Sequence, residues 1–159
     1  MPLETASEQE IAGLVQRAAN ANAAFMNGDM LRWHSLLPVS ADFSIMTPFG
    51  NWSANGFDAS ADRLADMART FTSAKTDLEV IATYASADMV VLALVERQFA
   101  VVGGLPPQDW SLRVTLVFRR NQNDWDLVHR HADPLVTSIS LEMASALAKI
   151  ATDTTAKKA

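Results

Sequence analysis

The chain has 159 residues, of which 49% are hydrophobic and 19% are charged, a composition typical of one globular domain with its own core. Its formal net charge of −5 argues against nucleic acid as a partner, because a protein that binds phosphates needs a basic face. There are no cysteines, so disulfides, thiolate metal sites and cysteine nucleophiles are excluded.

The N-terminal part of the chain predicts two helices. Residues 1–7 are expected to be flexible, and they lack the basic start and apolar centre of a secretory signal. Ser7 and Glu10 form a capping box before a run of apolar residues at helical spacing. Asp29 is expected to cap a second, short helix that ends before Pro38. Because no apolar run approaches the roughly 20 residues of a membrane span, we expect a cytoplasmic protein without membrane contact.

The rest of the chain predicts strands on either side of one helix. A short strand is expected from Asp42 to Met46, a return strand begins at Trp52, and Asp58 is expected to cap a third helix. Four long strands follow, at about residues 76–84, 89–99, 110–120 and 125–133. A last helix is expected from about Ser140 to residue 151.

The hairpin that ends the strand region has the clearest pattern. In its first strand, from Trp110 to Phe118, apolar residues alternate with mainly polar ones, which indicates one apolar face. Strict alternation in its second strand predicts one shared face for five residues: Trp125, Leu127, His129, His131 and Asp133. Arg130 is expected on the opposite face, and Pro134 is expected to close the strand.

The order of elements predicts an α+β fold, because a meander of long strands needs helices to cover one face. A strongly curved, mixed or antiparallel sheet wrapped around the N-terminal helices would form a cone with a ligand pocket at its open end. We expect one domain over residues 8–137, a C-terminal helix over residues 138–151 and a disordered tail over residues 152–159.

The closing hairpin also contains the pattern R-x-T-x-x-x-x-R … W-x-x-x-H-x-H-x-D, formed by Arg113, Thr115, Arg120, Trp125, His129, His131 and Asp133. Together with the order of elements, this pattern resembles the SnoaL-like branch of the NTF2-like superfamily from about Glu8 to Leu135. The run Gly103-Gly104-Leu105-Pro106 and the H-x-H also resemble the association domain of calcium/calmodulin-dependent protein kinase II. That superfamily includes isomerases, cyclases, dehydratases and oligomerisation modules, so the resemblance implies a fold and not one activity.

At two places the sequence differs from the site residues of these relatives, and each difference argues against one of their functions. The general base of the ketosteroid isomerases would fall at Thr47, which cannot accept a proton near neutral pH as a carboxylate does. The pocket arginines of the association domain would fall at Val95, Thr115 and Ala132. Instead, three arginines lie an even number of residues from those positions and are expected to form a basic pocket on the same sheet face: Arg97, Arg113 and Arg130.

The predicted ligand pocket combines these arginines with nearby polar and apolar side chains: Trp33, Met46, Trp52, Arg97, Phe99, Arg113, Thr115 and Arg130. The arginines suit an anionic ligand, because the planar guanidinium matches a carboxylate. Alternatively, they pair with acidic residues across strands, for which the candidates are Glu79, Glu96, Asp109 and Asp126. The aromatic residues and the methionine are alternatively ordinary core.

His129, His131 and Asp133 form the predicted catalytic set, with a histidine as acid/base, Asp133 to orient it and Arg113 to stabilise negative charge. These residue types also suit a divalent metal, but side chains two apart on a strand point in parallel. We therefore expect neither a metal nor a cofactor. In the alternative interpretation the histidines pack against a helix or a partner subunit, and Asp133 bonds to a ring.

Three hypotheses for the function follow. The first is a protein that binds a small, largely hydrophobic molecule, either neutral or anionic. In this hypothesis the protein is a homodimer, because self-association covers its apolar sheet. The second is a cyclase, isomerase or hydratase that acts on a carbonyl compound through His131 or His129. The third is an oligomerisation module.

Overall fold

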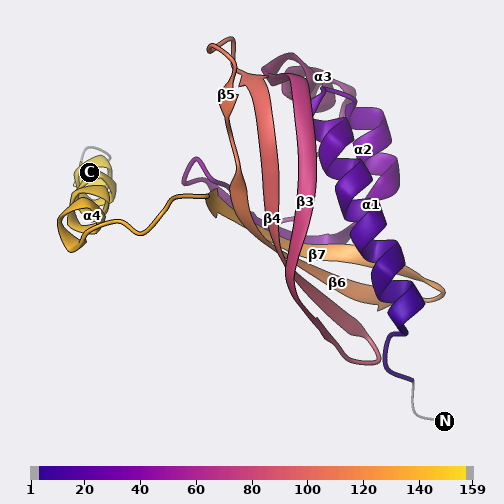
Figure 1. The fold of residues 1–159 in the computed structure, drawn as a ribbon. Helices are drawn as coiled ribbons and strands as arrows, with labels where there is room; N and C mark the ends of the chain where they lie inside the picture. The colour runs from indigo at the N-terminus through magenta and orange to yellow at the C-terminus, as the bar shows by residue number, and fades with distance from the viewer. Residues whose placement is uncertain (1–3, 157–159) are drawn as a thin grey trace.

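The structure is a computed structural model that describes residues 4–156, and it shows the N-terminal helices packed on one side of a mixed sheet (Figure 1). The helices are α1 (Glu8–Met26), α2 (Met30–Leu36), α3 (Ala61–Thr70) and α4 (Leu141–Ala156). The strands are β1 (Val39–Met46), β2 (Trp52–Ser53), β3 (Phe71–Ala85), β4 (Met89–Val102), β5 (Gln108–Asp109), β6 (Leu112–Asn121) and β7 (Asp124–Pro134).

The sheet has the strand order β2-β1-β7-β6-β4-β3, and β5 pairs with β4. Neighbours among β3, β4, β6 and β7 are antiparallel, whereas β1 runs parallel to β7. The predicted α+β fold, with N-terminal helices on a mixed sheet, is therefore confirmed.

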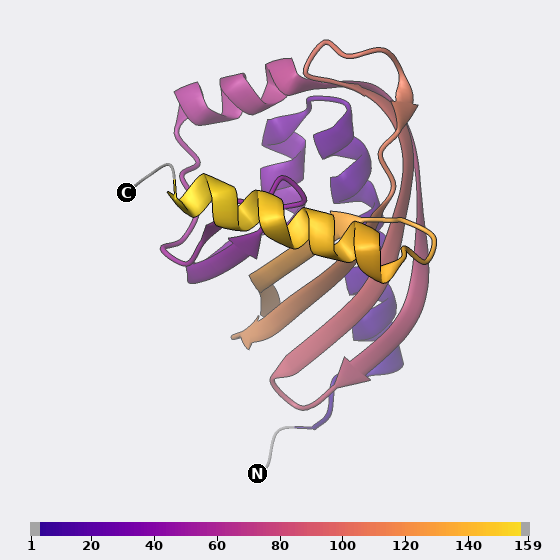
Figure 2. The same ribbon diagram turned by 90° about the vertical axis from the view of Figure 1, so that its left-hand side faces the viewer.

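The core lies between α1 and one face of the sheet. Alternate residues of β4 and β6 point toward the helix and are buried: Leu92, Leu94, Val114, Leu116 and Phe118. On α1 they meet Leu14, Ala18 and Ala21. We call the side of the sheet that contacts α1 the inner face and the opposite side the outer face. Both views show α1 on one side of the sheet and α4 on the other (Figures 1 and 2).

The start of α1 is anchored more firmly than the sequence predicts. The capping box is present: the Glu10 amide donates to Ser7 Oγ at 3.1 Å, and the Ser7 amide donates to the Glu10 carboxylate at 2.9 Å. The preceding Ala6 is buried, and its amide donates to the Ser86 carbonyl at 2.9 Å. Of the segment predicted to be flexible, residues 6 and 7 thus make hydrogen bonds to the rest of the chain, and residues 1–3 lie outside the described chain; the flexibility itself stays a prediction.

Strand β7 contains a β-bulge at Val128. Leu127 pairs with Phe118 of β6, and the next paired residue, His129, pairs with Val117. Two residues of β7 therefore advance for one residue of β6, and Val128 has no partner of its own. A bulge of this kind interrupts the strict alternation of side chains between the two faces.

The bulge separates residues that the hairpin pattern placed on one face. Trp125 and Leu127, which precede it, are buried on the inner face with the core. The side chains that face outward after the bulge are those of His129, His131 and Asp133, which pair with outward-facing residues of β6. Arg130 lies on the inner face. The predicted shared face was wrong, because the prediction took every second residue of β7 to share a face, and the bulge at Val128 shifts that register.

Helix α4 stands apart from the sheet. It begins at Leu141, close to the predicted start, and continues to Ala156, so residues 152–156 are helical where a disordered tail was predicted. Residues 141–150 are all exposed. In both views the helix lies beyond the outer face, at the end of the connection formed by residues 135–140 (Figures 1 and 2). Among the described helices, none is long and apolar enough to cross a membrane.

Candidate functional site

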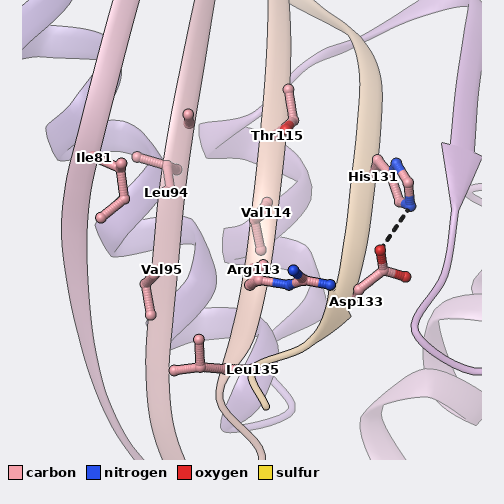
Figure 3. Close-up of a pocket in the computed structure, with 10 residues that line it drawn as sticks. Ile81, Leu94, Val95, Arg113, Val114, Thr115, His131, Asp133 and Leu135 are labelled. Carbon is pink, nitrogen blue, oxygen red and sulfur yellow. Dashed lines mark ion pairs between the residues drawn. The ribbon is translucent and has the colours of Figure 1, made fainter. Parts of the chain in front are cut away.

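A concavity of about 420 Å³ lies on the outer face across strands β3, β4, β6 and β7 (Figure 3). Its apolar side chains are those of Ile81, Ala93, Val95 and Leu135. Leu94 and Val114 also border it, although their side chains are buried in the inner core. Four polar side chains complete it: Arg113, Thr115, His131 and Asp133. The pocket was predicted at the open end of a cone formed by the sheet around the N-terminal helices, whereas this concavity is on the face of the sheet opposite α1.

His131 and Asp133 interact directly in the concavity. They are two residues apart on β7, so both project from the outer face, and His131 Nε2 lies 3.2 Å from Asp133 Oδ2 (Figure 3). At this distance the two side chains form an ion pair whenever the His131 ring is protonated. The side chains are 42% and 48% exposed, so water reaches both.

Arg113 supplies positive charge to the same place. It is the cross-strand partner of Asp133, and its side chain extends along the sheet toward β7 (Figure 3). Within residues 4–156, each other arginine of β4, β6 and β7 is in a salt bridge: Arg97 with Glu79, Arg119 with Asp42, Arg120 with Glu10 and Arg130 with Glu96. No such bridge holds Arg113, which leaves its guanidinium available to a ligand.

His129 is on the outer face but outside the concavity. Its Nδ1 lies 2.7 Å from Ser44 Oγ on the parallel strand β1. The two histidines therefore have different partners and do not converge. In the described part of the chain, no three His, Asp or Glu side chains are arranged to hold a metal ion.

The other predicted pocket residues of the outer face do not line the concavity. Arg97 and Phe99 line a second hollow of about 320 Å³, where Glu79 holds the Arg97 guanidinium at 2.8 Å. Met46 and Trp52 are exposed where β1 pairs with β2, and Met46 is the cross-strand partner of His131.

Trp33 belongs to the inner side. Its ring centroid lies 5.4 Å from that of Phe25 and 5.1 Å from that of Phe57, both edge to face. This aromatic group joins α1, α2 and the segment before α3, as the ordinary-core interpretation of Trp33 predicts.

Arg130 lies on the inner face, where Arg130 Nη2 is 2.9 Å from Glu96 Oε2. The prediction that it shares a face with Arg97 and Arg113 was wrong. Glu96 is only 4% exposed, and burial raises the pKa of its carboxyl, while the Arg130 charge opposes that rise. Sequence reasoning named Glu96 only as a pairing partner. Its burial beside an arginine is visible only once the strand faces are assigned.

Two N–H groups on the inner side are buried without an acceptor, Arg130 Nη1 and Trp110 Nε1. Nearby backbone and side-chain groups are satisfied: Asn22 of α1 donates to the Gln98 side chain at 3.0 Å, and Gln98 donates to the Trp110 carbonyl at 3.1 Å. The inner face therefore carries a polar layer within an apolar core.

The sequence matches one family model, described as a SnoaL-like domain, over residues 15–137. No curated protein matches the chain.

Solved structures with similar folds extend the comparison. An NTF2-like protein of unknown function in nutrient uptake from Rhodospirillum rubrum is 23% identical, with a TM-score of 0.60 over 79% of this chain and 98% of that one. A provisionally assigned calcium/calmodulin-dependent protein kinase type II association domain from Thiobacillus denitrificans is 21% identical, with a TM-score of 0.57 over 76% and 93%. An NTF2-like superfamily protein from Salmonella enterica is 19% identical, with a TM-score of 0.66 over 86% and 99%. At these identities the likeness concerns the fold alone.

Proposed function

The chain belongs to the SnoaL-like domain family, and on that premise we propose that it binds a small, mainly hydrophobic molecule with an anionic oxygen in the outer concavity. The observation that carries the proposal is the guanidinium of Arg113, which has no salt bridge within the described chain and lies over an aliphatic hollow. The volume of about 420 Å³ falls within the range of about 300–1,000 Å³ usual for small-molecule sites.

The residues around the concavity suit both the anionic group and the hydrophobic part of such a ligand. The guanidinium of Arg113 can donate two parallel hydrogen bonds to a carboxylate. Ala93, Val95 and Ile81 offer aliphatic contacts to the remainder of the molecule. Asp133 would repel an anion, but His131 already occupies one of its oxygens, which reduces that repulsion.

The proposal includes a homodimer, as expected from the sequence. Several large apolar side chains are exposed on the outer face, among them Ile81, Tyr84 and Phe99. A second copy of the chain would remove them from water, and a twofold dimer does so without leaving an open surface for further growth.

A second candidate function is acid–base catalysis on a carbonyl compound, and the contact of 3.2 Å between His131 and Asp133 favours it. In this role Asp133 would orient the ring, and the ring would take a proton from a substrate carbon or water. Arg113, on the neighbouring strand, would then stabilise the negative charge that develops on the carbonyl oxygen.

Titration of the protein with octanoate, followed by nuclear magnetic resonance, tests the binding proposal. Octanoate joins a carboxylate to an aliphatic chain, and octanamide serves as its uncharged match. Octanoate should shift amide signals of β4, β6 and β7, and Arg113→Met should weaken binding about tenfold or more, as loss of a charge-assisted hydrogen bond does. Arg97→Met is the control, since Arg97 lies on the same face and is already paired.

Equal affinity for octanoate in the Arg113→Met and Arg97→Met variants would contradict the proposal. Catalysis is tested separately with His131→Ala, which should abolish turnover of a carbonyl substrate while octanoate still binds. If binding and turnover are lost together, His131 acts in binding and the second candidate fails.

A further inference from the structure

Helix α4 presents apolar side chains to solvent on the side of the outer face. Met143 and Leu147 lie one turn apart on the same side of the helix and are 54% and 56% exposed. Leu141, at its start, is 86% exposed. The charged residues Glu142 and Lys149 lie together on another side of the helix, about a third of a turn away from the Met143–Leu147 stripe. A helix with this distribution is expected to pack its apolar stripe on another surface.

The outer face of the sheet carries a matching apolar surface. Its exposed large hydrophobic side chains come from four strands, with Ile81 and Tyr84 at one edge and Trp52 at the other: Met46, Trp52, Ile81, Tyr84 and Phe99. The concavity with Arg113 and His131 lies between these edges. One chain thus contains both an apolar helix and an apolar sheet face, which lie on the same side of the molecule (Figure 2).

The connection before α4 leads the helix away from its own sheet. The Leu135 amide still donates to the Ser111 carbonyl at 2.9 Å, and the Met143 amide donates to Ser140 Oγ at 3.1 Å as the helix begins. The residues between these two anchors can span about 15–20 Å when extended. The chain therefore has the length needed to place α4 on a neighbouring molecule (Figure 1).

We propose that α4 of one copy packs against the outer sheet face of a second copy and covers that copy's concavity. In the same way, α4 of the second copy packs against the outer sheet face of the first, so that the two contacts are related by a twofold axis. This inference deepens the proposed function, on which it rests for what the concavity binds. The contact itself is between two copies of the chain and needs no ligand.

The area available is sufficient for a stable dimer. Seven large apolar side chains are exposed on the two surfaces: Met143 and Leu147 on α4, and Met46, Trp52, Ile81, Tyr84 and Phe99 on the sheet. If each loses on the order of 100 Å² to the contact, one copy contributes on the order of 700 Å², which lies within the share of about 600–1,000 Å² that each partner has in a stable interface.

Covering the concavity changes what its residues do. His131 and Asp133 are about half exposed in one copy, and in water a charge such as Arg113 attracts an anion only weakly. A helix from the second copy excludes water and strengthens that attraction. The site is thus open in one copy and is completed by α4 of the other.

Analytical ultracentrifugation of the full chain without ligand is the first test. The mass should be twice 17.3 kDa, and a variant with Met143→Asp and Leu147→Asp should raise the dissociation constant at least about tenfold. The control variant carries Glu142→Lys and Lys149→Glu, which exchange charges on the other side of α4 and should leave the mass unchanged. A monomeric wild-type chain, or a dimer that the stripe variant does not weaken, overturns the proposal.

Cross-linking then locates the helix, helped by the absence of native cysteines. Tagged chains with Leu147→Cys are mixed with untagged chains with Ile81→Cys, and a short bismaleimide should join tagged to untagged chains. If a chain with both cysteines instead links only within itself, α4 folds back on its own sheet and the proposal fails. Failure of octanoate to bind a cross-linked dimer would reject the proposed function and leave the helix exchange intact.

Discussion

Removal of Arg130 should destabilise the fold by leaving a buried carboxylate without its counter-charge. Arg130 Nη2 lies 2.9 Å from Glu96 Oε2, and Glu96 is 4% exposed. At that separation, with an effective dielectric constant of about 20, the attraction is roughly 6 kcal/mol, part of which desolvation offsets. We therefore expect Arg130→Met to lower the free energy of unfolding by about 3–5 kcal/mol near neutral pH, as for other broken buried pairs.

The loss should depend on pH in a definite direction. Burial raises the pKa of Glu96 and Arg130 lowers it, so the folded-state pKa rises further in the Arg130→Met variant. A carboxyl whose pKa is raised in the folded state favours folding most below its unfolded pKa of about 4.3, and that stability is lost as pH rises through the folded pKa. The destabilisation of the variant should therefore be larger at about pH 8 than at about pH 5.

Urea unfolding followed by tryptophan fluorescence measures both effects. The variant with Glu96→Leu and Arg130→Met is the matched control, because it removes both charges and should unfold with nearly the wild-type free energy or a higher one. The reasoning is refuted if Arg130→Met costs less than about 1 kcal/mol near neutral pH, or if its cost is the same at both pH values.

Two further predictions concern the ends of α1. Gly28 has a φ of +78°, and a Cβ there would lie 2.8 Å from the Phe71 carbonyl oxygen, whereas Gly50 has a φ of +89° and nothing within 4 Å. Gly50→Ala should cost about 1–2 kcal/mol of unfolding free energy for its backbone conformation alone. Gly28→Ala should cost clearly more, because its Cβ also meets the Phe71 carbonyl oxygen. Equal costs of the two substitutions in urea unfolding would contradict this prediction. The hydrogen bond from Arg120 lowers the pKa of Glu10 to about 2, so the charged carboxylate stabilises the fold above its unfolded pKa of about 4.3 and loses that effect as pH falls toward the folded pKa. The difference in urea midpoint between the wild type and Glu10→Gln should shrink over that interval, and a difference that does not change with pH would be evidence against this role of Glu10.

Local signals in the sequence predicted the elements of the fold. The capping box at Ser7 and the Asp29 cap mark the starts of α1 and α2, and both are present. Period-two alternation in β6 correctly placed Val114 and Phe118 on the buried face. These features depend on residues that are close in the chain, so they can be predicted from a single sequence.

The faces of β7 could not be predicted in the same way. Leu127 and Val128 are two apolar residues in a row, which fits a strand covered on both faces as well as a bulge, and only the pairing with Val117 and Phe118 of β6 reveals the additional residue. A bulge is a property of two strands and has no fixed signal in one. For that reason Arg130 was expected among the outer arginines and lies instead beside Glu96.

The candidate site was predicted in part. Arg113, Thr115, His131 and Asp133 do come together. Residues two apart on a strand share a face, and no bulge lies between the two members of either pair. Trp33, Met46, Trp52, Arg97, Phe99 and Arg130 do not join them. Their distances from the concavity follow from the strand order and the packing of α2, which depend on contacts between residues far apart in the chain.

A crystal structure of the full chain grown with octanoate would test the central claim most directly, because it locates the ligand as well as detecting it. The account predicts the carboxylate within hydrogen-bond distance of the Arg113 guanidinium, with the aliphatic chain against Ala93 and Val95. Octanoate bound on the inner face beside Arg130 and Glu96, with the concavity empty, would contradict it.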